Sequence, residues 1–161
     1  MRLCALFLLL AGCTGVKNGI TTPVQGDPLA FAQQAQPVLQ RHCAFEACHG
    51  RADLALSLYA VDYVRLATGG PGTPLDERVL SDEELDHNHW ALAVRVDSPD
   101  PEASRLLRKV RPISDGGEGH FDVTTIFSSR ADPDYQALCA WAQTVSAARW
   151  PGKSTGCAPA P

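Results

Sequence analysis

Two cysteines and a histidine lie close together near the N-terminal third of the chain and constrain its fold more than any other feature. In the segment RHCAFEACHG, four residues separate Cys43 from Cys48, and His49 follows Cys48 directly. Side chains of these types form disulfides, bind metal ions or attach a prosthetic group covalently. Each outcome fixes the backbone at this point, so the neighbouring segments must fold around it.

The N-terminus predicts export from the cytoplasm. Arg2 precedes an apolar run over 3–11, which is too short to span a bilayer and has the form of a secretory signal. The run ends in Leu-Ala-Gly before Cys13, a pattern typical of bacterial lipoproteins, in which the signal is cut before a cysteine that takes up lipid. We expect a signal peptide at 1–12, then a lipidated Cys13 and flexible tether at 13–26. The lipid alone would hold the protein on the periplasmic or outer-surface side of a membrane. An ordinary signal peptide beside an unrelated cysteine is the alternative.

Export also bears on the other cysteines. Compartments outside the cytoplasmic membrane are oxidising enough to keep disulfides. With Cys4 in the signal and Cys13 lipidated, four of the six cysteines remain, and Cys139 can pair with Cys157. This disulfide would tie the C-terminal tail to the segment before it, whereas two unrelated thiols are the alternative.

Length and charge favour a single domain that does not bind nucleic acid. The chain has 161 residues and a formal net charge of −4 at pH 7, with no basic stripe to neutralise phosphates. We therefore expect one domain over 27–161.

Helix-start signals predict a mainly α fold. Asp27 and Asp132 each precede a proline, which is the pattern of an N-cap followed by proline at the first helical position. Ser81 opens a capping box. The first helix is expected to kink or restart at Pro37, and apolar spacing predicts a further short helix over 58–66. Long Gly- and Pro-rich loops join the helices, and such loops in a small domain are usually functional.

A covalent haem site needs two thiols about one helical turn apart and an imidazole beside the second thiol. The thiols add to two vinyl groups of the porphyrin and the imidazole binds the iron, and the usual signature is C-x-x-C-H. The spacing here is longer, but the extra residues can bulge outward and leave both sulfurs in place. We predict thioether bonds at Cys43 and Cys48, with His49 as the proximal iron ligand.

At these residues the chain resembles the c-type cytochromes, especially small, exported, often lipid-anchored bacterial members with an expanded haem motif. The similarity extends to PEASRLLRKV, which precedes a glycine-rich histidine segment, and to DPDYQALCAWA after it. The resemblance implies a cytochrome c-like helical domain in which the N-terminal helix packs across the C-terminal one. One haem c would lie between these helices and the loops, with Phe31 and Trp141 at the crossing.

The distal iron ligand is expected to be a histidine. Many cytochromes of this kind use a methionine, but the one methionine in this sequence is Met1, which lies in the signal. His120, in a glycine-rich loop, is the first candidate, followed by His89 and then His87, while an open or non-protein site is the other possibility. His42 directly precedes the first cysteine and is expected to point away from the iron.

Two imidazole ligands would close both sides of the iron and exclude small molecules. This arrangement predicts an electron carrier that serves redox protein partners in the cell envelope, with a lower potential than methionine ligation gives. We see no catalytic constellation, so we expect no enzyme activity unless the distal site is open. The first alternative is a haem-free lipoprotein with Cys43 joined to Cys48, acting as an interaction or scaffold module. A zinc site from these cysteines and two histidines is the second alternative, although its ligand spacing is poor.

A local basic cluster lies between the motif and the glycine-rich loop, at Arg105, Arg108, Lys109 and Arg111. These cations can meet haem propionates or an acidic redox partner, or they form a solvated helix face.

Overall fold

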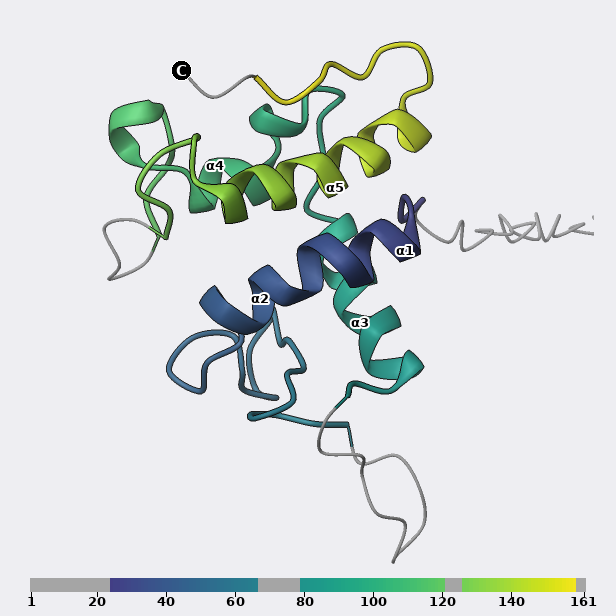
Figure 1. Ribbon diagram of the computed structural model, residues 1–161, viewed down its shortest axis with the longest axis vertical. Coiled ribbons are helices and arrows are strands. Elements are labelled where there is room, and N and C mark those ends of the chain that lie inside the picture. Colours follow the sequence, from purple (N-terminus) through teal and green to yellow (C-terminus); the bar gives the residue numbers. More distant parts are fainter. Residues whose placement is uncertain (1–23, 67–78, 121–125, 159–161) are drawn as a thin grey trace, which may run out of the picture.

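The structure is a computed structural model that describes residues 24–66, 79–120 and 126–158. Within these ranges the chain is helical and has no β-strand, which confirms the mainly α fold (Figure 1). The predicted signal peptide, Cys13 and most of the tether lie outside the described residues. No helix of the described part is long and apolar enough to cross a membrane.

The N-terminal helix is built from three consecutive pieces. These are α1 (Pro28–Ala30), a π-helical turn η1 (Phe31–Ala35) and α2 (Gln36–His42). The Asp27 carboxylate accepts two backbone N–H groups of the first turn at 2.8 and 3.2 Å, which confirms the predicted cap. The wide turn η1 ends two residues before Pro37, so the irregularity occurs in the turn where the missing N–H of proline interrupts the regular bonding pattern.

The remaining helices begin at the other predicted caps. Ser81 and Glu84 form both bonds of a capping box, and the Asp132 carboxylate accepts the N–H of Asp134 at 2.9 Å. The further helical segments are α3 (Asp82–Ala93), the 3₁₀ turn η2 (Pro101–Ala103), α4 (Arg105–Val110), the 3₁₀ turn η3 (Ile113–Asp115) and α5 (Pro133–Arg149).

The short helix predicted over 58–66 is wrong, because this segment is irregular and contains only turns and bends. Its backbone is held by side chains of α3 instead. The N–H of Tyr59 donates to Asn88 Oδ1 at 2.8 Å, and the N–H of Leu66 donates to Glu84 Oε1 at 2.7 Å. These tertiary bonds replace the bonds that a local helix would have made.

The N-terminal helix packs against α5 through buried aromatic side chains. The rings of Phe31 and Trp141 meet edge to face with centroids 5.2 Å apart, which confirms the expected contact. His89 of α3 stacks on Phe31 at 4.7 Å. Gly26 comes so close to α5 that an added Cβ would lie 2.6 Å from Thr144 Oγ1, so a larger residue there would push the helix away. This crossing fixes the direction in which α2 delivers the cysteine motif.

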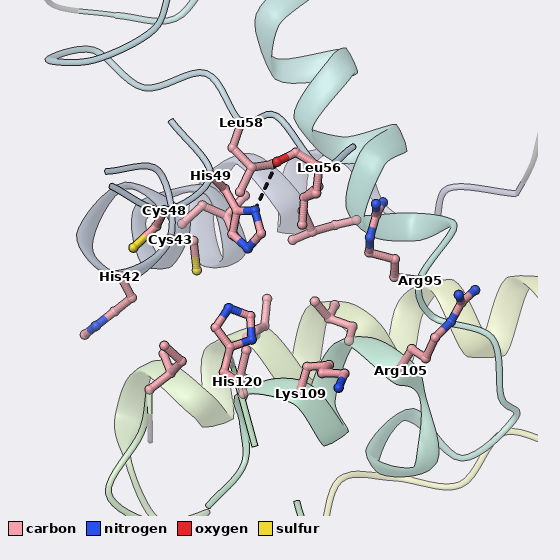
Figure 2. A pocket seen from close by; sticks show the side chains of 16 residues that line it. His42, Cys43, Cys48, His49, Leu56, Leu58, Arg95, Arg105, Lys109 and His120 are labelled. Atoms are coloured by element: carbon pink, nitrogen blue, oxygen red, sulfur yellow. Dashed lines mark hydrogen bonds between the residues drawn. The ribbon is translucent and has the colours of Figure 1, made fainter. Parts of the chain in front are cut away.

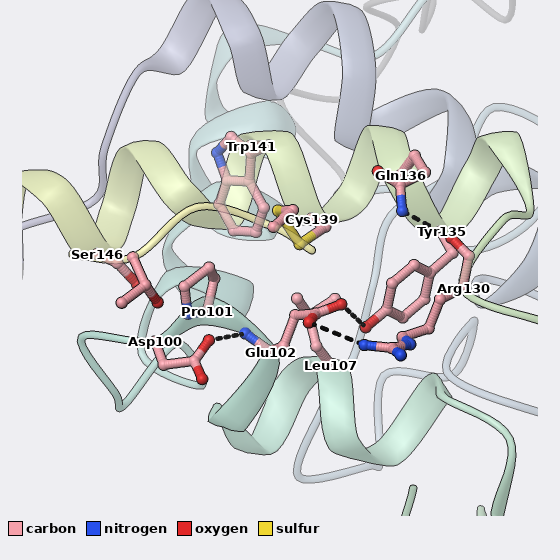
Figure 3. The surroundings of a disulfide bond; sticks show 12 residues. Asp100, Pro101, Glu102, Leu107, Arg130, Tyr135, Gln136, Cys139, Trp141 and Ser146 are labelled. Carbon is pink, nitrogen blue, oxygen red and sulfur yellow. Dashed lines mark hydrogen bonds and ion pairs between the residues drawn. A yellow bond between two sulfur atoms is a disulfide. The ribbon is translucent and has the colours of Figure 1, made fainter. Parts of the chain in front are cut away.

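The predicted disulfide between Cys139 and Cys157 is present and returns the C-terminal tail to α5 (Figure 3). Beside it lies a buried carboxylate, Glu102, which accepts the hydroxyl of Tyr135 at 3.1 Å and pairs with Arg130 at 3.4 Å. The disulfide therefore joins the tail to a rigid part of the core.

We expect Cys157→Ser to lower the free energy of unfolding by about 3 kcal/mol, because a bond that closes a loop of this length restricts the unfolded chain by that amount. Guanidinium unfolding measures the change. A reductant should destabilise the wild type to the level of the variant and leave the variant unchanged. Equal unfolding midpoints for wild type and variant would contradict the stabilising role of this disulfide.

Candidate functional site

A cavity of about 280 Å³ lies where the cysteine motif faces α4 and α5 (Figure 2). Its walls are largely apolar, with side chains that include Leu39, Leu56, Leu58, Leu92, Val110 and Leu138. Polar side chains line its two ends. A cavity of this kind suits a flat apolar ligand that is held by a few directed groups.

The loop between the two cysteines folds outward and brings its ends together. Cys43 terminates α2, and its carbonyl accepts the N–H of His49 at 3.0 Å. The carbonyl of Phe45 accepts the N–H of Cys48 at 2.9 Å. Between them, residues 46–47 are exposed. Both cysteines and the histidine therefore line one cavity although the motif is long.

Gly50 permits the tight return of this loop. An added Cβ would lie 2.1 Å from the carbonyl oxygen of Ala44, closer than any side-chain carbon can approach. The N–H of Gly50 also donates to Phe45 O at 2.8 Å. Only glycine fits at the position that follows His49.

The thiols of Cys43 and Cys48 are free and are not joined to each other. Burial, together with the charge of the neighbouring Cys48, raises the pKa of the Cys43 thiol to about 12. This thiol is therefore protonated at neutral pH, which slows disulfide exchange because the thiolate is the attacking species.

His49 is oriented by a backbone carbonyl that the sequence did not reveal. Its Nδ1 lies 3.0 Å from the carbonyl oxygen of Leu56, and because a carbonyl only accepts, Nδ1 carries the proton. The other ring nitrogen, Nε2, then has a free lone pair that points toward His120 (Figure 2). A partner of this kind fixes the tautomer and the ring orientation of metal-binding histidines.

His120 faces His49 across the cavity. The two ring centroids are 5.7 Å apart and the ring planes meet at 62°. Burial lowers the pKa of His120, and the positive charges of His49 and Lys109 lower it further. His120 is therefore held in the neutral form, which is the form that binds metal ions.

The other three histidines are engaged elsewhere. Nε2 of His89 lies 2.7 Å from the carbonyl oxygen of Gln25 within the aromatic core, and Nε2 of His87 lies 3.0 Å from that of Ser57. Neither of these two histidines lines the cavity. His42 lies at the cavity wall, but its ring nitrogen is 2.7 Å from an Asp134 oxygen and points outward (Figure 2).

Three cations line the end of the cavity opposite the cysteines (Figure 2). Arg105 and Lys109 belong to the basic cluster seen in the sequence, whereas Arg111 of that cluster turns away and donates to Gly116 O at 2.9 Å. The third cation, Arg95, follows α3 and does not belong to that cluster, so no local sequence pattern predicts its place in the cavity.

The cavity thus brings together two thiols and two imidazoles. These side chains can attach a planar group covalently at one edge and hold its metal from both faces. In the described ranges, no three or more His, Cys, Asp or Glu side chains are grouped so that they could hold a metal ion alone. Comparisons with family models, with curated proteins and with solved structures gave no match to this chain.

Proposed function

We propose that the protein is an exported, lipid-anchored c-type cytochrome with one haem, which carries single electrons between redox proteins of the cell envelope. Cys43 and Cys48 would attach the porphyrin, and His49 and His120 would hold its iron. When bound, the haem supplies an iron centre that alternates between the ferric and ferrous states.

The observation that carries this proposal is the facing pair of imidazoles beside two free thiols. A metal–imidazole bond is about 2 Å long, so two imidazoles on opposite sides of one metal ion have centroids about 6 Å apart. The 5.7 Å between His49 and His120 fits this spacing. The hydrogen bond from His49 to Leu56 leaves the nitrogen that faces the cavity available for the iron.

The residues that line the cavity favour an electron carrier over an enzyme. With His49 and His120 both holding the iron, no position would stay open for a substrate, and the apolar lining of the cavity would disfavour water beside it. Histidine on both sides also favours a lower reduction potential than histidine with methionine.

A reduced-minus-oxidised visible spectrum of protein matured with the c-type attachment machinery tests the proposal. We expect the narrow bands of a low-spin haem, and their loss in His49→Ala. Colourless mature protein with Cys43 joined to Cys48 would overturn the proposal and favour the haem-free lipoprotein.

The distal ligand has a separate test. We expect His120→Ala to open one face of the iron, so that added carbon monoxide shifts the spectrum of the reduced variant but not that of the wild type. His87→Ala is the matched control and should remain unchanged, because its ring contacts Tyr59 and Ser57 outside the cavity. If His120→Ala stays low-spin and does not respond to carbon monoxide, another group is the ligand.

A further inference from the structure

The cavity has two chemically different ends. The thiols and the facing imidazoles lie at one end, whereas Arg95, Arg105 and Lys109 lie at the other (Figure 2). Leucine and valine side chains separate the two ends. A ligand that fills this space must therefore be apolar in the middle and able to meet positive charge at one edge.

Of the three cations at this end of the cavity, Arg95 gives the strongest evidence for an anionic ligand. Its guanidinium donates to the backbone carbonyls of Ala91 and Ala55, the second at 3.4 Å, and it forms no ion pair with a carboxylate of the described residues. Burial and the nearby charge of Arg105 both lower the pKa of Arg95. A partly buried cation without a counter-charge costs free energy, and an anion bound beside it would offset that cost.

The two neighbouring cations are only partly neutralised. Arg105 and Lys109 lie one turn apart on α4. Arg105 pairs with Asp97 at 2.9 Å, and Lys109 pairs at 3.3 Å with Glu118, which Arg108 shares. These pairs are largely exposed and therefore weak. The cations at this end outnumber the carboxylates, so the site remains positive.

We infer that this cationic end binds the two propionate carboxylates of the porphyrin, with Arg95 as the main positioning residue. The inference rests on the proposed function. The carboxylate edge of the porphyrin lies away from the vinyl groups that the cysteines attach, so the two ends of the cavity match two edges of one ring. A guanidinium binds a carboxylate through two parallel hydrogen bonds, which gives direction as well as charge. Thioethers at one end and Arg95 at the other allow a single orientation of the ring.

The midpoint potential of the matured full-length protein tests the inference. We expect Arg95→Met to retain covalent haem but to have a lower potential, because removing a nearby cation leaves the propionate charge unbalanced and disfavours uptake of an electron. Arg95→Lys keeps the charge and should restore most of the wild-type potential. Lys153→Met removes one charge from the C-terminal tail outside the cavity and should leave the potential unchanged.

Each possible result supports or overturns the inference that this end of the cavity binds the propionates. A folded, haem-loaded Arg95→Met with the wild-type potential would overturn the inference and leave the proposed function intact, whereas a colourless wild type would overturn both. If Arg95→Met does not fold, the double variant Arg105→Met/Lys109→Met takes its place, since both of its side chains are exposed. A lower potential of that variant supports the inference, and an unchanged one overturns it.

Discussion

Replacing both motif cysteines, as Cys43→Ala/Cys48→Ala, is expected to abolish covalent attachment of haem completely. The wild type should keep its haem in acidified acetone, and each single variant should keep it through the one remaining bond and in lower yield. The reason is geometric, since both cysteines line the same cavity and are the two lining residues that carry thiols. Intact-mass spectrometry measures the result directly, because attached porphyrin adds its full mass to the chain.

The second cysteine pair supplies the matched control. Cys139→Ala/Cys157→Ala removes two sulfurs that are joined to each other outside the cavity, and it should destabilise the protein without loss of covalent haem. A wild-type mass without porphyrin, from cells that mature known c-type cytochromes, would show that this motif is not read as an attachment site.

Glu84→Gln is expected to lower the free energy of unfolding by about 3 kcal/mol or more, because it puts a neutral amide in place of the buried carboxylate that pairs with Arg65. The Glu84 side chain is completely buried. Its oxygens accept from Arg65 Nε at 2.8 Å, from the N–H of Ser81 at 2.9 Å and from the N–H of Leu66 at 2.7 Å. One carboxylate therefore holds the start of α3 and the end of the irregular segment together. Guanidinium unfolding at pH 7 measures the loss.

The same carboxylate should make stability depend on pH. Burial alone would raise the pKa of Glu84, but the hydrogen bonds from Arg65 and from two backbone N–H groups outweigh it and lower the pKa from 4.5 to about 2. Since the folded-state pKa is depressed, this stabilisation is present above pH 4.5 and is lost as the pH falls toward 2. Glu84→Gln should remove this part of the acid sensitivity.

Glu83→Gln is the control for charge, because it lies next to Glu84 on α3 but is exposed. Its effect at pH 7 should stay within about 0.5 kcal/mol. Equal stability of Glu84→Gln and Glu83→Gln at pH 7 would mean that the ion pair between Arg65 and Glu84 does not stabilise the contact between α3 and the irregular segment 58–66.

The parts of the fold that sequence reasoning predicted are those with local causes. A cap such as Asp27 or Ser81 acts on the backbone within three residues of itself, so the residue types alone determine where the helix begins. The helix predicted over 58–66 is wrong for the opposite reason, because distant residues determine its backbone. Its apolar spacing suggested a helix, but its backbone bonds go to Asn88 and Glu84, which belong to a helix later in the chain.

The candidate site likewise has residues that the sequence predicts and residues that only the packing reveals. Cys43, Cys48 and His49 stand together in the sequence and were visible as a motif. The hydrogen bond from His49 to Leu56 and the position of Arg95 depend on how irregular segments pack between the helices, and no periodic pattern reports that packing. The lack of a methionine outside the signal leaves histidine as the expected distal ligand, and the glycine-rich loop favours His120 among the five. The structure places His120 opposite His49.

The wide turn η1 has a consequence for how the N-terminal helix tolerates changes in length. A π-helical turn holds one residue more than a regular turn, so it absorbs an insertion while the flanking turns keep their phase. In this helix Phe31, the first residue of η1, packs against Trp141 of α5, and Cys43 lines the cavity after the last residue of α2. Removing one glutamine from the bulge would give a regular turn without rotating either face, whereas a deletion within α2 would turn the cysteine away from the pocket.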